Sequence, residues 1–253
     1  MKKIYLSFII IILVCWSCTY QSRYNHQQRA FDNFLLNNNL ALSHSQNDLQ
    51  KVEFMNKFEH DLFRYVDSAR LFINWQGQIS DIKYRENSTA VEFIISYKPE
   101  KYRKISFYCT HFIDPDSLQN DYIYNSLKNI SNYSTVYFDG IIRTNSNETV
   151  KYHFGSPGND LNIPYPSFEF SIIDIGTTSR SDSLSVNLQN AIDCNNKMID
   201  VINLNHHKKI SNKELKERYK KLEYEFDKAE TKLTKQERDY LNRVIKAMVL
   251  NLS

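Results

Sequence analysis

LFINWQGQISDI (residues 71–82) and SFEFSIIDIG (residues 167–176) begin and end a region of the chain in which apolar and polar residues alternate. A period of two is typical of β-strands that bury one face. Three further segments with this alternation lie between the two ends, so the region predicts five strands. The residues that we expect on the buried faces are Ile73, Trp75, Gly77 and Ile79, then Val91, Phe93, Ile95 and Tyr97, then Ile105, Phe107 and Cys109, then Val136, Phe138 and Gly140, and finally Phe168, Phe170 and Ile172.

The order of these segments predicts a particular kind of barrel. Asp114–Ser117 ends the third strand, and Tyr122–Ile130 has the spacing of a short helix before the fourth. Five strands with a helix between the third and the fourth are the order of an OB-fold, a small and strongly curved barrel. Gly77 and Gly140 stand where such a barrel needs a bulge or a sharp bend. We therefore expect an OB-like β-barrel over residues 71–176.

The same region contains several short motifs of aromatic, glycine and aspartate residues. They are Asn74-Trp75-x-Gly77-x-Ile79-x-Asp81-Ile82, Asp114-x-Asp116, Tyr124-x-x-Leu127, Val136-x-Phe138-x-Gly140, and Phe168-x-Phe170 with Ile175. Together they resemble an uncharacterised family of bacterial exported domains with an OB-like fold. The chain departs from that family at Tyr133-Ser134, where Gly-Asp is usual, and at Asp139, where a small residue is usual. The resemblance implies the fold and export, but no activity, because the matching residues are mostly structural.

The N-terminus has the features of an export signal. Met1-Lys2-Lys3 is positively charged, and Ile4–Trp16 is an apolar run of 13 residues. Such a run is too short to cross a bilayer core of ~30 Å and has the size of the apolar part of a signal peptide. We therefore expect the chain to leave the cytoplasm.

The end of this leader, Val14-Cys15-Trp16-Ser17-Cys18, resembles a bacterial lipobox. The resemblance implies a lipoprotein signal peptide over residues 1–17 and acylation of Cys18, and several acyl chains would hold the protein stably to the membrane. Thr19, in place of Asp, favours the outer membrane by resemblance to the sorting rules of such lipoproteins. No acidic run follows Cys18, which argues against export to the outer surface and so favours the side that faces the periplasm. Plain secretion and an uncleaved N-terminal anchor are the alternatives, and Cys15 is a poorer lipid acceptor because Val14 precedes it.

The segments before and after the barrel predict helices and connections. Residues 18–46 are rich in Asn, Gln and Ser and predict a polar tether. Residues 47–70 predict an amphipathic helix, because apolar side chains recur at steps of three and four at Leu49, Val52, Met55, Phe58, Leu62 and Val66. Residues 177–210 predict a connecting segment, in which a helix through Leu188, Ile192 and Ile199 and a strand near residues 199–202 are both possible.

The C-terminal residues 211–253 predict a helical hairpin. Ser211-Asn212-Lys213-Glu214 and Thr234-Lys235-Gln236-Glu237 are capping boxes, which mark the starts of two helices. A short connection between two helices favours antiparallel packing of one against the other. The predicted fold class is therefore α+β: a small OB-like β-barrel flanked by an N-terminal amphipathic helix and a C-terminal helical hairpin.

Tyrosines on the predicted surface are the candidates for a binding site. Tyr84, Tyr102 and Tyr108 are out of phase with the buried faces, whereas Trp75 and Tyr97 are in phase with them. OB-folds use exposed aromatic residues as stacking platforms for single-stranded nucleic acid or for sugars. The sequence therefore predicts a weak binding surface at the three exposed tyrosines.

The charge of the chain and its ionisable residues limit other functions. The formal net charge is +3, and it falls to about +1 without the two lysines of the leader, so we expect no nucleic-acid partner. Asp114 and Asp116 are weak candidates for ligand binding, because Asp-Pro-Asp-Ser is common turn sequence and lacks the Gly and the distal Glu of an EF-hand. His206-His207 has no further ligand at the spacing of a metal site. We therefore predict no metal and no cofactor.

No catalytic residue is predicted, since the chain lacks the Gly-x-Ser-x-Gly, His-Glu-x-x-His and P-loop motifs. Export would permit a disulfide between Cys109 and Cys194, although Cys109 is in phase with a buried face, and the pairing stays open. The favoured function is that of a non-enzymatic cell-envelope lipoprotein whose OB-like domain binds a protein, a peptide or a glycan. The alternative is an envelope enzyme or enzyme accessory that acts on polysaccharide or cell wall with two carboxylates about 5–10 Å apart.

Overall fold

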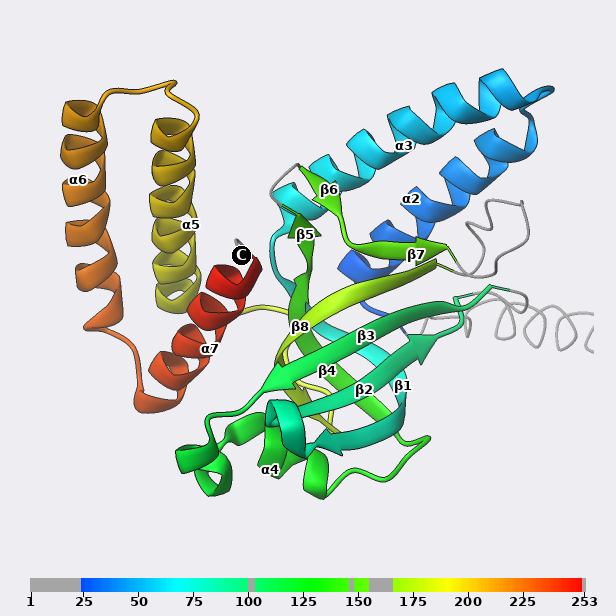
Figure 1. The fold of residues 1–253 in the computed structure, drawn as a ribbon. Coiled ribbons are helices and arrows are strands. Elements are labelled where there is room, and N and C mark those ends of the chain that lie inside the picture. Colours follow the sequence, from blue (N-terminus) through cyan, green and yellow to red (C-terminus); the bar gives the residue numbers. More distant parts are fainter. Residues whose placement is uncertain (1–23, 100–102, 146–147, 155–165, 252–253) are drawn as a thin grey trace, which may run out of the picture.

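The computed structural model describes residues 24–99, 103–145, 148–154 and 166–251, and it has the predicted α+β fold (Figure 1). The strands are β1 (Phe72–Arg85), β2 (Ala90–Tyr97), β3 (Ile105–Phe112), β4 (Thr135–Ile142), β5 (Thr144–Asn145), β6 (Thr149–Val150), β7 (Tyr152–Phe154) and β8 (Pro166–Gly176). The helices are α2 (His26–Ser43), α3 (Asp48–Ala69), α4 (Tyr122–Lys128), α5 (Val186–His206), α6 (Asn212–Glu230) and α7 (Lys235–Asn251), with short 3-10 turns η1 (Glu86–Ser88) and η2 (Pro115–Asn120).

The five predicted strands form a closed barrel. Their order is β3-β2-β1-β4-β8, and β8 returns to pair with β3 in parallel, from Ser106 opposite Ser167 to Cys109 opposite Phe170. All other pairs between neighbouring strands of the barrel are antiparallel. This mixed pairing, with α4 between the third and fourth barrel strands, confirms the prediction of an OB-like barrel.

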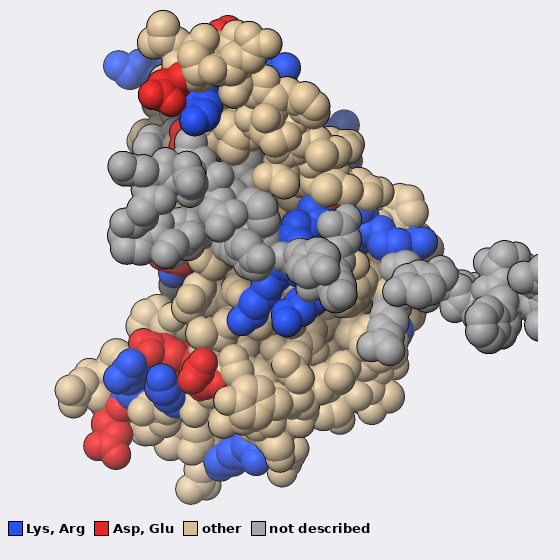
Figure 2. All heavy atoms as spheres, turned by 90° about the vertical axis from the view of Figure 1, so that its right-hand side faces the viewer, with Lys and Arg blue, Asp and Glu red and all other residues tan. Residues whose placement is uncertain are grey.

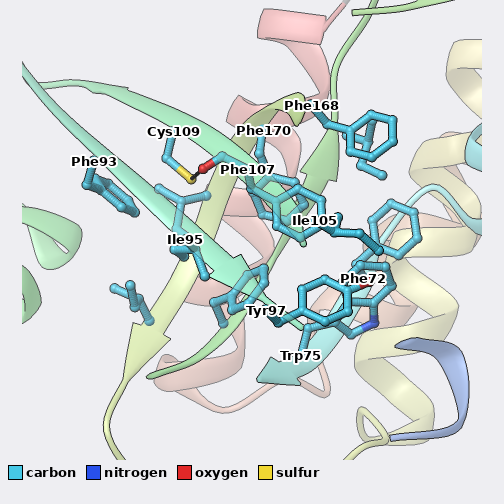
Figure 3. Packing of buried hydrophobic residues seen from close by; sticks show 14 of the residues in the cluster. Phe72, Trp75, Phe93, Ile95, Tyr97, Ile105, Phe107, Cys109, Phe168 and Phe170 are labelled. Carbon is cyan, nitrogen blue, oxygen red and sulfur yellow. Dashed lines mark hydrogen bonds between the residues drawn. The ribbon is translucent and has the colours of Figure 1, made fainter. Parts of the chain in front are cut away.

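Aromatic side chains fill the barrel (Figure 3). The Phe107 ring lies 5.0 Å from that of Phe170 and 5.7 Å from that of Phe138, and the Trp75 ring lies 4.5 Å from that of Phe72. The inward residues predicted for the second, third and fourth strands are all in the interior. Aromatic rings remove large apolar areas from water, and they leave no room for a ligand between them.

The first strand departs from the predicted alternation. Asn74 has a φ of 52°, and the pairing of β1 with β4 shifts between Phe72 and Trp75. This β-bulge turns Phe72 into the barrel and places Ile73 outside, against a second apolar cluster. The prediction that Ile73 shares a face with Trp75 is therefore wrong, because an extra residue in a bulge reverses the phase.

The two glycines of the barrel act through close packing. At Gly140 the pairing of β4 with β8 shifts, as predicted, and an added Cβ would overlap the Phe170 ring and the backbone oxygen of Ser171. At Gly77 no register shift occurs, and an added Cβ would lie 2.5 Å from Cγ2 of Ile95. Both positions therefore exclude a side chain.

Helices close the barrel at both ends (Figure 1). Ile123 and Leu127 of α4 join the core from one side. The apolar faces of α2 and α3 join it from the other, where Phe31 of α2 lies 5.5 Å from the Trp75 ring. Burial of these faces adds to the hydrophobic stabilisation of the barrel by about 25 cal/mol for each Å² of apolar surface.

Helix α2 corrects the predicted polar tether over residues 18–46. Residues 26–43 are helical, and residues 18–23 lie outside the part of the chain that the structure describes. The polar residues that suggested a tether include Gln28 and Asp32, which are buried with hydrogen-bond partners on the barrel: Tyr97 donates to Asp32 (2.9 Å). Composition alone does not reveal such partners.

The predicted amphipathic helix over residues 47–70 is confirmed as α3, and Asn47 caps it by accepting a hydrogen bond from the Gln50 N–H (3.0 Å). The stripe from Met55 to Val66 is buried. Leu49 and Val52, by contrast, are 83% and 60% exposed, because the first turns of α3 extend beyond the barrel. Among the described residues no helix combines the length and apolar character needed to cross a bilayer.

The C-terminal helices pair differently from the prediction. The second capping box is complete, since Thr234 and Glu237 bond to each other's backbone N–H groups. At the first, Ser211 accepts from the Glu214 N–H (3.2 Å), whereas the Glu214 carboxylate accepts from Arg218. However, α6 packs along α5, within the predicted connecting segment, and not along α7 (Figure 1). Helix α7 instead covers the outer face of β4 and β8, where Ile141 and Ile173 need apolar partners. The predicted hairpin of residues 211–253 is corrected to an α5–α6 hairpin followed by α7.

Candidate functional site

The structure does not bring the predicted binding residues together. Tyr84 packs edge-on against Tyr124, with 6.1 Å between ring centres, and Tyr108 lies in a groove on β3. Tyr102 lies outside the described residues. Asp114 begins η2 and accepts a hydrogen bond from the Asp116 N–H (3.2 Å), which is the turn chemistry that the sequence suggests. Among the candidates that the structure describes, Tyr108 lines a groove, whereas Tyr84 is 43% exposed beside Tyr124.

The groove around Tyr108, here called the β3 groove, has a volume of about 370 Å³. Its lining residues are Tyr108, Thr110, Phe112, Arg143, Glu169 and Phe170. Alternate residues of β3 point outwards, so Tyr108 and Phe112 lie on the same face, 47% and 46% exposed. Two exposed aromatic rings along one strand can stack on planar or apolar faces of a ligand.

An ion pair forms the other wall of the β3 groove. Arg143 lies 3.4 Å from the Glu169 carboxylate, and its backbone N–H donates to the Glu169 carbonyl (2.9 Å). The Arg143 Nε has no hydrogen-bond partner within the described residues. This Nε is itself buried, so a ligand would meet the outer edge of the guanidinium, in a side chain that is 23% exposed and paired with Glu169. That edge can donate to a carbonyl, hydroxyl or carboxylate of a ligand. The groove therefore offers stacking and directed hydrogen bonds together.

A second groove, here called the β1 groove, was not predicted. It has a volume of about 430 Å³, and its lining residues are Tyr24, Gln76, Gly77, Gln78, Ser80, Ser96, Tyr97, Lys98, Lys104, Tyr133 and Thr135. Gln78 is opposite both Thr135 of β4 and Ser96 of β2, so these three polar residues form a row across the strands. Sequence spacing cannot show this row, because its members come from three separate segments.

Two tyrosines border the β1 groove. Tyr24 donates a hydrogen bond to the Lys98 carbonyl (3.1 Å) and packs edge-on against Tyr97 at 5.3 Å. Tyr133 is 73% exposed with a φ of 68°, a left-handed conformation that favours glycine. Its carbonyl accepts from the Gln78 side chain (3.0 Å), which fixes the turn. The groove thus has a rigid polar floor and an aromatic edge.

Asp139 is the most deeply buried carboxylate of an ionic cluster between the barrel and α7. It is 2% exposed and accepts hydrogen bonds from the Asn74 N–H (2.6 Å), Arg180 (2.9 Å) and the Tyr240 hydroxyl (2.8 Å). Burial raises the pKa of this carboxyl, against the opposing charge of Arg180. The bonds attach the segment after β8 and the helix α7 to the barrel.

Asp174 is opposite Asp139 in the sheet and shares Arg180 with it. It also accepts a hydrogen bond from the Tyr122 hydroxyl (2.8 Å), and Arg243 lies 3.9 Å away. Neither carboxylate lines the β1 groove or the β3 groove. Because each is neutralised by arginine in the protein interior, the pair has the arrangement of a structural cluster.

His111 and Asp121 form another partly buried pair, with 2.9 Å from the ring nitrogen to each carboxylate oxygen. Burial alone would raise the pKa of Asp121, but hydrogen bonds from His111 and the Tyr124 N–H outweigh it and lower that pKa. Asp121 also caps α4 through this N–H (2.8 Å). Within the described residues, the hydrogen bonds of the His111 ring go to Asp121 and to no hydroxyl or thiol.

The two described cysteines do not form a disulfide. Cys109 and Cys194 are both free and buried, the first inside the barrel and the second on α5. Burial raises the pKa of the Cys109 thiol well above its usual value, which keeps it protonated and unreactive. In the described part of the chain, no three His, Cys, Asp or Glu side chains are placed to hold a metal ion.

Comparison with known proteins identifies no relative. No protein-family model matches the chain, and neither the curated proteins nor the solved structures gave a significant match.

Proposed function

We propose that this chain is a non-enzymatic lipoprotein of the bacterial cell envelope, anchored through lipid on Cys18, whose OB-like barrel binds a peptide or a glycan in the β3 groove. The lipobox-like end of the leader and the motifs similar to exported OB-like domains support this location. The favoured position is the outer membrane, on the side that faces the periplasm. The ligand would then be a component of the envelope.

The interior of the barrel is filled by side chains, so we expect a ligand to bind on the outer surface. Trp75, Phe107 and Phe138 are fully buried at the centre of the barrel, and helices cover its ends. OB-folds commonly bind ligands on the outer face of their second and third strands and at the loop between the last two strands. The β3 groove shares part of this position, since it combines β3 with Arg143, just after β4. Its other wall is Glu169 and Phe170 of β8, which pairs with β3, and no β2 residue lines it.

The observation that carries the proposal is the pair of exposed aromatic rings beside Arg143. Tyr108 and Phe112 supply apolar contact area at low cost in side-chain entropy, and Arg143 and Glu169 supply polar contacts of both signs. Peptides and glycans both present apolar faces next to hydrogen-bonding groups. The alternative of an envelope enzyme has less support, because neither groove is lined by two carboxylates.

Photocrosslinking in the native membrane tests the β3 groove. A photoreactive benzoylphenylalanine at Tyr108 should crosslink a defined species, which mass spectrometry then identifies as peptide or glycan. The matched control places the same residue at Tyr224, an exposed tyrosine on α6. Loss of the adduct in a Phe112→Ala background supports the groove. The same adducts from both positions, or none from Tyr108, would contradict the proposal.

Processing of the leader tests the lipid anchor separately. Globomycin, or the change Cys18→Ala, should block cleavage and leave a precursor longer by the 17 residues of the leader. Cys15→Ala is the matched control, and it should leave cleavage and detergent partitioning unchanged. Normal processing of Cys18→Ala would show that Cys18 is not the lipidated residue.

A further inference from the structure

We propose that the β1 groove binds the anionic headgroups of bilayer lipids, so that this face of the barrel lies against the membrane that carries the lipid anchor. The inference rests on the lipidation of Cys18 in the proposed function. It concerns a different surface from the β3 groove, since the two grooves have no lining residue in common. Three properties of the β1 groove carry it: its distance from the anchor, its charge and its polar floor.

The chain itself limits how far the β1 groove can be from the membrane. Tyr24 lines the groove, and Cys18 precedes it by six residues. Even a fully extended chain spans at most about 3.5 Å per residue, so Tyr24 lies within roughly 20 Å of the acylated cysteine. Tyr24 is held to the barrel by its bond to the Lys98 carbonyl. An anchor at Cys18 therefore keeps this groove close to the headgroups.

The charge of the β1 groove is suited to an anionic surface. Lys98 and Lys104 are exposed at its edge, and no carboxylate lines it. Neither lysine forms an ion pair with any residue that the structure describes. Figure 2 shows this side of the molecule, where Lys and Arg side chains gather at mid-height and the larger groups of Asp and Glu side chains lie above and below. Lysines at an anionic membrane surface each add to binding.

The floor and the edge of the groove suit a phosphate-bearing headgroup. Gln78, Ser96 and Thr135 place amide and hydroxyl groups in one row across the strands, in the groove that the two lysines also line. Tyr133 holds an exposed ring at the edge in a strained backbone conformation. Tyrosine is enriched at the level of the headgroups, where its ring meets the apolar boundary and its hydroxyl stays in water. The lysines and the polar side chains of the groove therefore suit the charged headgroups, and the Tyr133 ring suits the boundary between the headgroups and the acyl chains.

The first experiment measures vesicle binding without the anchor. The mature chain from residue 18, kept unlipidated by Cys18→Ser, is sedimented with vesicles of phosphatidylcholine alone or with about one third phosphatidylglycerol. We expect binding to the anionic vesicles, and its loss at high salt. Equal binding to both vesicles, or no binding to either, would overturn the proposal. If millimolar inorganic phosphate displaces the protein from the vesicles, the groove is a site for a free anion, and the proposal is overturned as well.

Charge variants locate the surface. Lys98→Gln with Lys104→Gln should lower the partition onto anionic vesicles about 30-fold. The matched control, Lys220→Gln with Lys221→Gln on α6, removes the same charge from another exposed surface and should change the partition about twofold at most. Both pairs should melt at the wild-type temperature, because these lysines are exposed. Equal losses in the two pairs would indicate a general charge effect and contradict the groove.

A third variant tests the competing apolar surface. Leu49 and Val52, at the exposed start of α3, could also enter a membrane. Leu49→Gln with Val52→Gln should leave binding to anionic vesicles unchanged. If this double variant loses vesicle binding, the membrane contact is made by α3 instead. Since the vesicle assay needs no acyl chain, its failure is distinguishable from a failure of Cys18 processing.

Discussion

The side chain of Gln28, in α2, pairs with the backbone of Gln76, in β1, as a neighbouring strand would. The Gln28 amide nitrogen donates to the Gln76 carbonyl (2.8 Å), and the Gln76 N–H donates to the Gln28 amide oxygen (2.9 Å). Pairing of β1 with β2 begins only at Gln78, so this edge of β1 needs another partner. Backbone groups at a partly buried edge cost free energy if they have no partner, and the side chain of one glutamine supplies both hydrogen bonds here.

Gln28→Ala should therefore destabilise the fold. It leaves a partly buried N–H and carbonyl of Gln76 without their side-chain partner, at a cost of about 2 kcal/mol in the free energy of unfolding. Urea denaturation measures the change. Gln119→Ala, at an exposed glutamine of η2, is the control and should stay within about 0.5 kcal/mol of wild type. Equal stabilities of the two variants would contradict the importance of this pairing.

Arg180→Met tests the ionic cluster. The change removes the guanidinium that neutralises Asp139 and Asp174, both buried, and should cost about 3–5 kcal/mol. The control is Arg218→Met, in an exposed pair with Glu214, which should cost at most about 0.5 kcal/mol. Denaturant midpoints of the two variants at pH 7 give the comparison. A small effect of Arg180→Met would mean that the two carboxylates become hydrated or protonated in the variant, and it would contradict the role of Arg180.

Gly140→Ala tests the close packing at the β4 bulge. The new methyl group would overlap the Phe170 ring and the Ser171 carbonyl, so we expect a loss of about 3 kcal/mol or insoluble protein. Gly176→Ala is a matched control, since an added Cβ there has no neighbour within 4 Å. Thermal melting of the two variants separates a steric effect from a general effect of replacing glycine. Wild-type melting of Gly140→Ala would contradict the packing.

Asp121→Asn separates the charge of Asp121 from its capping role, because asparagine is also a good helix cap. The pKa of Asp121 is lower in the folded chain than in the unfolded chain, so the ionised form stabilises the fold above the unfolded value. We expect wild type to be more stable by about 1 kcal/mol at neutral pH. This difference should disappear as the pH falls from about 5 to below 3. A difference that does not vary with pH would contradict a stabilising role of the ionised Asp121 carboxylate, which is hydrogen-bonded to His111.

The strands of the barrel are predictable from the sequence because each buries one face and alternates over its own length. The alternation of Phe93, Ile95 and Tyr97 is local, and it is correct. The β-bulge at Asn74 is not predictable in this way, since an asparagine with positive φ leaves no periodic trace. The α2 helix is not predictable from the polar composition of residues 18–46, because its buried Gln28 has its partner in a strand about 50 residues later.

The grooves are less accessible to sequence reasoning than the strands. Tyr108 was recognised because exposure follows from the phase of a single strand. The row of Thr135, Gln78 and Ser96 depends on which strands are neighbours and on their register. The outer face of β8 is apolar and is covered by α7. Because α7 packs there, α6 packs against α5 and not against α7. The features that the sequence does not predict all depend on contacts between segments that are far apart in the chain.

The parallel pairing of β3 with β8 sets the order in which this protein can fold. The paired residues Ser106 and Ser167 are 61 positions apart, so β3 keeps an open edge until the chain has been completed past Gly176. Closing so long a loop is slow, and an open edge can pair with another chain. A chain shortened before Pro166 would therefore remain an unfinished sheet, and such fragments should aggregate, whatever ligand the finished surface binds.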